Sequence, residues 1–179
     1  MKSKEETRAK FRKIRESLSP SRRREARQNA TDTLYEELSG KGLVLSFASK
    51  SEEIDLWLLN KRLADENRLA LPRLTSDTEI TPFIVDNVDE LISHHKWNVL
   101  EPDPEFSKEA LLANIECVLV PGIAFDSNHF RLGYGKGHYD RFLSNLSCPF
   151  WGIGFKEQKS KDLLETSEHD IPLTKLFLF

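Results

Sequence analysis

Glycines that alternate with cations mark one stretch of the sequence as a possible site for chemistry. Residues 131–141 read Arg-Leu-Gly-Tyr-Gly-Lys-Gly-His-Tyr-Asp-Arg, and residues 121–126 read Pro-Gly-Ile-Ala-Phe-Asp. Glycine lets the backbone approach a ligand closely and turn its amides toward an anion. Arg131 and Lys136 would add positive charge for phosphates, and a helix opening near Gly137 would add its positive end. The stretch is therefore a candidate phosphate-binding loop.

Two common phosphate-binding patterns do not fit this loop. Lys136 is followed by Gly137, where a Walker loop has Ser or Thr, and the third glycine of a dinucleotide fingerprint would fall at His138. The residues alone leave two interpretations open, a structural turn and a nucleotide cradle of another kind. Structural turns are the more common of the two.

The same stretch resembles the signature of the 5-formyltetrahydrofolate cyclo-ligase family, approximately Pro-Gly-x-Ala/Gly-Phe-Asp, a short spacer, and Arg-Leu-Gly-x-Gly-x-Gly-x-Tyr-Asp. The resemblance implies that ATP phosphates are held by Arg131, Leu132, Gly133, Tyr134, Gly135, Lys136, Gly137, His138 and Tyr139. The part from Tyr134 to His138 would also face the folate. Lys136 would contact the transferred phosphate, with Arg131 as the second catalytic cation, and Asp140 would bind Mg²⁺.

Two histidines depart from the family pattern. The family usually has glycine at the position of His129 and tyrosine at the position of His138. His tolerates a positive φ less well than glycine, so the spacer turn could differ locally. His138 could hydrogen-bond a ligand as tyrosine would, could act in acid–base chemistry, or could be a loop residue with no proton to move.

Lys4 and Arg8 lie four residues apart on one face of a predicted helix, beside its apolar side. Long cations often lie along an apolar stripe, which is sufficient reason for their presence. The resemblance implies a second role, because the family opens with a Lys-x-x-x-Arg helix whose two cations reach ATP.

An acidic turn follows the first predicted strand. Glu52, Glu53 and Asp55 could all cap the next helix, where negative charge is favoured. We prefer that interpretation for Glu52 and Asp55. Glu53 matches a family glutamate that hydrogen-bonds the pterin of the folate, and Ala48 would line the same pocket through its backbone.

Weaker similarities extend the resemblance over nearly the whole chain, at Pro72-Arg73, at residues 97–102, at residues 154–158 and at His169-Asp170-Ile171-Pro172. The family aspartate that matches Asp170 is implied to help hold magnesium. A turn carboxylate before proline is an equally good interpretation of Asp170.

The resemblance implies an ATP- and Mg²⁺-dependent ligase that converts 5-formyltetrahydrofolate to 5,10-methenyltetrahydrofolate through a phosphorylated formyl group, with release of ADP and phosphate. Phosphoryl transfer asks chiefly for positioning and charge neutralisation, which these residues could supply. One alternative is another ATP-dependent kinase or ligase that uses the same loop. A second is a nucleic-acid-binding protein, because residues 1–27 carry eleven Lys/Arg against four acids. No aromatic stacking motif accompanies that charge, so we expect no nucleic-acid partner.

Strands alternate with helices along the chain. The predicted helices cover residues 4–18, 19–40, 54–67, 107–115 and a stretch from about residue 137. The predicted strands cover residues 43–48, 69–74, 80–85, 117–120, 150–155 and 176–179. This order predicts an α/β fold, a three-layer sandwich with a mostly parallel or mixed sheet and helices on both faces. Ligands in such folds gather beyond the carboxyl ends of the strands, here after Ala48 and after Val120.

The composition of the chain bears on its domain organisation, its cysteines and its location. A chain of 179 residues with 39% hydrophobic residues suffices for one core, so residues 1–179 are expected to form a single domain. Cys117 and Cys148 lack the spacing of a metal knuckle or redox pair and are expected to be buried apolar residues. The charged first ten residues do not resemble a signal peptide, and no segment is long and apolar enough to span a membrane. We expect a cytoplasmic monomer.

Overall fold

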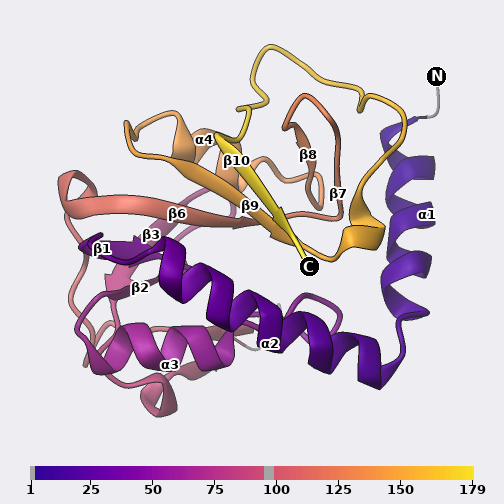
Figure 1. Ribbon diagram of the computed structural model, residues 1–179. Coiled ribbons are helices and arrows are strands. Elements are labelled where there is room, and N and C mark those ends of the chain that lie inside the picture. Colours follow the sequence, from indigo (N-terminus) through magenta and orange to yellow (C-terminus); the bar gives the residue numbers. More distant parts are fainter. Residues whose placement is uncertain (1–2, 95–98) are drawn as a thin grey trace.

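A six-stranded sheet forms the centre of the computed structural model, which describes residues 3–94 and 99–179 (Figure 1). The strand order is β10-β9-β6-β1-β2-β3. These strands are β1 (Leu43–Leu45), β2 (Leu69–Leu74), β3 (Ile80–Ile84), β6 (Ile115–Pro121), β9 (Phe150–Gly154) and β10 (Lys175–Leu178). All neighbours pair in parallel except β2 and β3, which are antiparallel. The predicted α/β class and mostly parallel sheet are confirmed.

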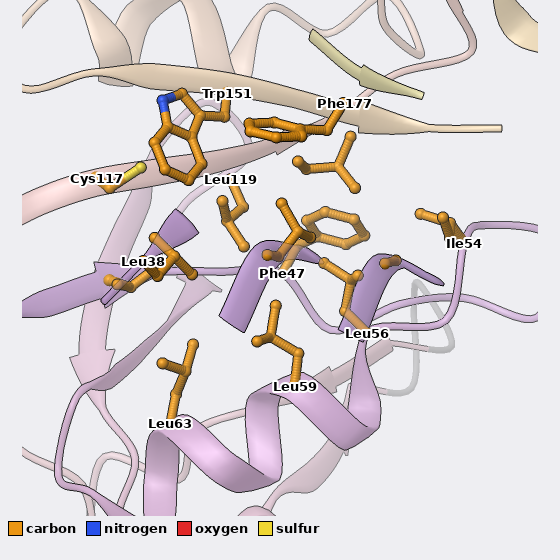
Figure 2. Close-up of a cluster of buried hydrophobic side chains, with 14 of the residues drawn as sticks. Leu38, Phe47, Ile54, Leu56, Leu59, Leu63, Cys117, Leu119, Trp151 and Phe177 are labelled. Carbon is orange, nitrogen blue, oxygen red and sulfur yellow. The ribbon is translucent and has the colours of Figure 1, made fainter. Parts of the chain in front are cut away.

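Alternating side chains place a hydrophobic core on each face of the sheet. On β6, Cys117 and Leu119 join one cluster and Val118 and Val120 join the other. Successive residues of a strand point to opposite faces, so an apolar run of this kind is buried on both sides. Figure 2 shows the first cluster, in which Trp151 packs beside Phe177.

Helices cover both faces and complete three layers. The first cluster packs under α2 (Pro20–Glu37) and α3 (Trp57–Asp65), and the second packs under the short helix α4 (His138–Leu143). The side chain of Ser19 accepts a hydrogen bond from the backbone N–H of Arg22, and Pro20 occupies the first turn, so α2 begins where its sequence predicts.

The N-terminal helix α1 (Lys4–Glu16) stands at the side of the sheet (Figure 1). Ser3 and Glu6 form a capping box at its start. Phe11 packs against Ile123, Ala124 and Leu132. The last two belong to an antiparallel ribbon of β7 (Ala124–Phe125) and β8 (Arg131–Leu132), which lies inside the predicted glycine-rich loop. A core contact thus fixes α1 beside that loop.

The chain leaves β1 and β6 in opposite directions across the sheet. β1 connects through α3 to β2 on one side, and β6 connects through α4 to β9 on the other. Right-handed crossovers in opposite directions put their helices on opposite faces, and a crevice opens between the two outgoing loops. These are the loops after Ala48 and Val120 that the sequence predicted to hold ligands.

One predicted helix is absent. The segment 107–115 runs instead along the edge of β3, where the N–H of Ile84 donates to Lys108 O at 2.8 Å and the N–H of Ala110 donates to Pro82 O at 2.8 Å. Only the 3₁₀ turn η2 (Leu112–Asn114) is helical. Pairing with an open strand edge outweighs a weak helical pattern.

Most other boundaries fall within three residues of the predictions. The first strand is shorter than predicted and ends at Leu45. The structure adds two further 3₁₀ turns, η1 (Val88–Glu90) and η3 (Lys156–Gln158). It also adds an antiparallel pair of strands, β4 (Ile92–His94) and β5 (Val99–Glu101), that the sequence analysis did not predict. Trp97 and Asn98, which resemble a family turn, lie outside the described residues.

Neither cysteine forms a disulfide, and Cys117 is buried as expected while Cys148 is half-buried. Burial raises the pKa of the Cys117 thiol to about 12. Across residues 3–94 and 99–179, no helix has the length and apolar character required to cross a membrane.

Candidate active site

A cavity of about 520 Å³ opens at the switch point of the sheet. Phe47 and Ala48 after β1, Pro72 and Leu74 on β2, and Pro121 at the end of β6 line it. All fifteen residues that the sequence analysis assigned to the site line this cavity: Lys4, Arg8, Ala48, Glu53, Arg131, Leu132, Gly133, Tyr134, Gly135, Lys136, Gly137, His138, Tyr139, Asp140 and Asp170. The fold therefore gathers groups from both ends of the chain.

The glycine loop has a left-handed backbone at two positions. Gly135 has φ 97° and Gly137 has φ 66°, conformations that L-residues with side chains rarely adopt. Arg141 anchors the glycine loop, because its Nη2 donates a hydrogen bond to Lys136 O at 2.7 Å. Nε2 of His138 lies 2.8 Å from Asp77 O, a contact in which this nitrogen must be the donor. The free protein thus uses His138 to tie the loop to the β2–β3 turn.

Two cations of the N-terminal helix, Lys4 and Arg8, reach the cavity. Nε of Arg8 donates to Gly133 O at 2.9 Å, and Nζ of Lys4 forms an ion pair with Asp170 at 3.1 Å. Since the partners are 125 and 166 residues away in the sequence, these contacts hold α1 against the glycine loop and the C-terminal segment. The two side chains therefore do more than cover an apolar stripe.

Arg131 and Asp140 form a buried ion pair in the cavity wall, with Nη1 to Oδ1 3.2 Å apart and side chains 5% and 16% exposed. Burial lowers the pKa of Arg131, while Asp140 opposes that effect. Nε of Arg131 is buried and has no hydrogen-bond partner in the part of the chain that the structure describes. The Asp140 Oδ1 also accepts the N–H of Ile171 at 3.2 Å, which brings Asp170 and Asp140 to the same wall.

Glu53 is a buried carboxylate, 8% exposed, in the turn after β1. Its side chain accepts the backbone N–H of Lys50 at 3.0 Å and the hydroxyl of Tyr134 at 3.2 Å. Burial raises the pKa of Glu53, while the Lys50 N–H and the charge of Arg15 oppose that rise. By contrast, Asp55 precedes the N-cap residue Leu56 and accepts the N–H of Trp57, the first residue of α3, at 2.8 Å.

The charged residues at this site that were not predicted from the sequence include Arg15 and Glu101. Arg15 is 1% exposed and donates from Nη2 to the Tyr134 hydroxyl at 3.1 Å, and its two other buried nitrogens have no hydrogen-bond partner within residues 3–94 and 99–179. Arg15 falls four residues after Phe11 on the apolar face of α1, and a cation at an apolar position is a sequence signal from which a buried cation could have been predicted. Glu101 also lines the cavity, and its sequence context is only a short strand before proline.

The spacer turn before the glycine loop keeps the backbone that glycine would adopt. His129 has φ 64°, in the left-handed region. Asp126, 1% exposed, organises this turn by accepting the N–H groups of Asn128 and Phe130 at 2.9 Å and that of Leu164 at 3.0 Å. His129 thus adopts the left-handed conformation that glycine adopts most readily.

The protein is a three-layer α/β protein with a cleft at the switch point of its mostly parallel sheet. The cleft suits an anionic ligand, because a glycine loop and several cations converge on it beside a buried carboxylate. The chain matches the model of the 5-formyltetrahydrofolate cyclo-ligase family over residues 1–177. It belongs to this family of ligases.

Named relatives agree with that assignment. The 5-formyltetrahydrofolate cyclo-ligase of Haemophilus influenzae is 26% identical over 176 residues, with 94% of each chain covered. The cyclo-ligase of Mycoplasma pneumoniae is 32% identical over 100 residues, which span 55% of this chain and 49% of that relative. The NMR structure of Aquifex aeolicus 5,10-methenyltetrahydrofolate synthetase superposes with a TM-score of 0.85 at 28% identity and covers 97% of this chain and 88% of that one.

Proposed function

We propose that this protein uses ATP to convert 5-formyltetrahydrofolate to 5,10-methenyltetrahydrofolate, with release of ADP and phosphate. The observation that supports this most strongly is the single cavity that joins the glycine loop and its cations to the buried carboxylate of Glu53. A phosphate-binding side and a hydrogen-bond acceptor for a pterin are what the two substrates require. The names of the relatives match this reaction.

In the proposed reaction the formyl oxygen attacks the γ-phosphorus of ATP and ADP leaves. N10 of the folate then attacks the formyl carbon, N10 loses its proton, and the carbon–oxygen bond breaks so that phosphate departs with the former formyl oxygen. Lys136 and Arg131 neutralise the charge on the transferred group, and Lys4, Arg8 and the loop amides hold the remaining phosphates. No covalent bond to the protein is needed.

Mg²⁺ would be held by Asp140 and Asp170 and would neutralise nucleotide oxygens. The residues fit this ion, since both carboxylates line the cavity and magnesium in such sites takes one or two carboxylates beside phosphate oxygens. Each is now paired with a cation, Arg131 or Lys4, which the metal would replace or join as counter-charge. Within the described residues, no cluster of three or more His, Cys, Asp or Glu offers a complete site without the nucleotide.

The basic N-terminal segment has partners inside its own protein. Arg8 contacts the glycine loop, Arg15 is buried against Tyr134, and Arg22 pairs with Glu157 at 2.8 Å. These contacts give three of the eleven cations in residues 1–27 partners within the chain, and we propose that nucleic acid is not a partner. A monomer in the cytoplasm remains our expectation.

The test is to mix purified protein with ATP, magnesium and 5-formyltetrahydrofolate and to follow methenyltetrahydrofolate by absorbance and ADP by chromatography. Equal amounts of the two products are expected. Methenyltetrahydrofolate without ATP consumption would rule out the ligase mechanism. ATP hydrolysis only with another acceptor would favour a different kinase or ligase.

A further inference from the structure

Glu101 is a second buried carboxylate in the cavity, and no step described above uses it. The residue is 2% exposed and lies at the end of β5. Its Oε1 accepts the backbone N–H of Leu74 at 3.1 Å, but its Oε2 is buried without a hydrogen-bond partner among the described residues. Among the described residues, the cation that pairs with Glu101 is Arg73, whose Nη1 lies 4.0 Å from Oε2 and donates instead to Pro102 O at 2.6 Å.

An unpartnered carboxylate oxygen is expensive to bury. A buried acceptor without a donor destabilises the folded protein, and a charged acceptor does so more strongly than a neutral one. The Arg73 side chain balances the charge but is too distant to satisfy Oε2. A ligand that brings an N–H into the cavity would remove this cost, and Oε2 is available to accept it.

The position of Glu101 favours the folate over the nucleotide. Leu74 ends β2, which lies on the far side of β1 from β6, the strand that leads into the glycine loop. The neighbouring cavity walls are apolar, formed by Pro72, Ile80 and Val99. A triphosphate would be repelled by a carboxylate, whereas a reduced folate has N–H groups on its pterin, at N10 and at its glutamyl amide.

We propose that Oε2 of Glu101 accepts a hydrogen bond from an N–H of the bound folate and so determines specificity for that substrate, together with Glu53. This inference rests on the proposed function. Two buried carboxylates on different elements would then fix the orientation of one extended ligand, which a single acceptor cannot do.

Glu101→Gln is the informative variant. In the free protein its amide oxygen can still accept the Leu74 N–H, with the NH₂ group placed where Oε2 was. In the complex with folate, that NH₂ group would face the folate N–H, so two donors would meet. If the amide were rotated by 180°, its NH₂ group would instead face the N–H of Leu74, which is also a donor. The variant should therefore melt at nearly the wild-type temperature yet bind 5-formyltetrahydrofolate about tenfold or more weakly.

Calorimetry with 5-formyltetrahydrofolate and, separately, with ATP and magnesium measures this effect. Glu105→Gln, an exposed change four residues away, is the matched control and should bind both ligands as the wild type does. ATP affinity in Glu101→Gln should change less than twofold. Unchanged folate binding, or a loss confined to ATP, would overturn the inference.

A variant that fails to fold is also decisive. If Glu101→Gln and the charge-retaining Glu101→Asp both unfold, Glu101 is a structural residue and the inference is wrong. Failure of the proposed function looks different, because the wild-type protein itself would then not bind 5-formyltetrahydrofolate.

Discussion

Lys136 lies between two glycines with left-handed backbones, and its side chain is exposed on the loop rather than part of a hydrophobic core. We expect Lys136→Ala to lower kcat by a factor of about a hundred or more with an unchanged melting temperature, because its charge stabilises the transferred phosphoryl group chiefly in the transition state. Steady-state kinetics and thermal melts measure both. A nearly normal kcat would show that the loop binds something other than the reacting phosphate.

Asp140→Asn is the matched comparison for the lysine variant. Weakening a metal ligand should be partly rescued by raising the magnesium concentration, whereas loss of the Lys136 charge should not be. Activity titrated with magnesium separates the two. Equal rescue of both variants would contradict the separate roles of these residues.

Glu53 should strengthen folate binding while lowering the stability of the folded protein. Its pKa is raised in the folded protein by burial, so the ionised group costs stability at any pH above the carboxyl pKa of the unfolded chain. Glu53→Gln removes that cost, and the free energy of unfolding at neutral pH should stay the same or rise. Folate binding should weaken by about 1–3 kcal/mol with ATP affinity nearly unchanged. Intact folate binding by calorimetry would leave Glu53 only its role in the turn.

Arg15 should control the pH range of folate binding. The ionised form of Glu53 is the acceptor, so binding is lost as pH falls through its raised pKa. The groups that act on this carboxylate are Arg15, Lys50, Glu52, Tyr134 and Tyr139. Arg15→Met removes a charge that lowers the Glu53 pKa, so folate binding should fail at a higher pH than in the wild type.

Arg12→Met provides the control for Arg15, since both guanidinium groups lie 5.8 Å from the Tyr134 ring centroid but only Arg15 acts on Glu53. Folate dissociation constants measured across pH should shift for Arg15→Met alone. A uniform loss of affinity at every pH would mean that Arg15 only supports the packing of Tyr134.

At the scale of the elements, the conformation of the glycine loop depends on its own backbone and on its contact with α1. A Cβ atom at Gly135 would lie 3.2 Å from Nη2 of Arg8, and the φ of 97° is itself unfavourable for alanine. Gly135→Ala should therefore destabilise the protein by about 1–2 kcal/mol and weaken ATP binding through Arg8. Chemical denaturation and nucleotide titration measure these effects.

Gly133→Ala is the internal comparison, because nothing lies within 4 Å of a Cβ at that position and its φ is not in the left-handed region. Its stability should match the wild type within about 0.5 kcal/mol. Equal destabilisation by both substitutions would contradict the role given to the backbone of Gly135.

Sequence reasoning found the long elements because capping and periodicity act locally. Ser19 and Pro20 fixed the start of α2, and the apolar run at β6 fixed a buried strand. It failed at residues 107–115, where the partner is the edge of β3 and no local pattern reports it. It also missed Glu101, since burial beside Leu74 depends on how β5 meets β2.

For the whole molecule, the site exists because distant segments converge on the switch point of one sheet. Lys4 comes from the first helix and Asp170 from the C-terminal segment, yet they form an ion pair at 3.1 Å. The resemblance to a family signature predicted that convergence, whereas the residues alone left Lys4 and Asp170 with simple structural roles. Contacts across such distances cannot be derived from local spacing.

The measurement that tests the central claim most directly follows one oxygen atom. The protein would be given ATP, magnesium and 5-formyltetrahydrofolate labelled with ¹⁸O in the formyl group, and the released phosphate would be analysed by mass spectrometry. Phosphorylation of the formyl oxygen predicts one labelled oxygen in each phosphate, with ADP and methenyltetrahydrofolate formed in equal amounts. Methenyltetrahydrofolate accompanied by unlabelled phosphate would contradict the mechanism.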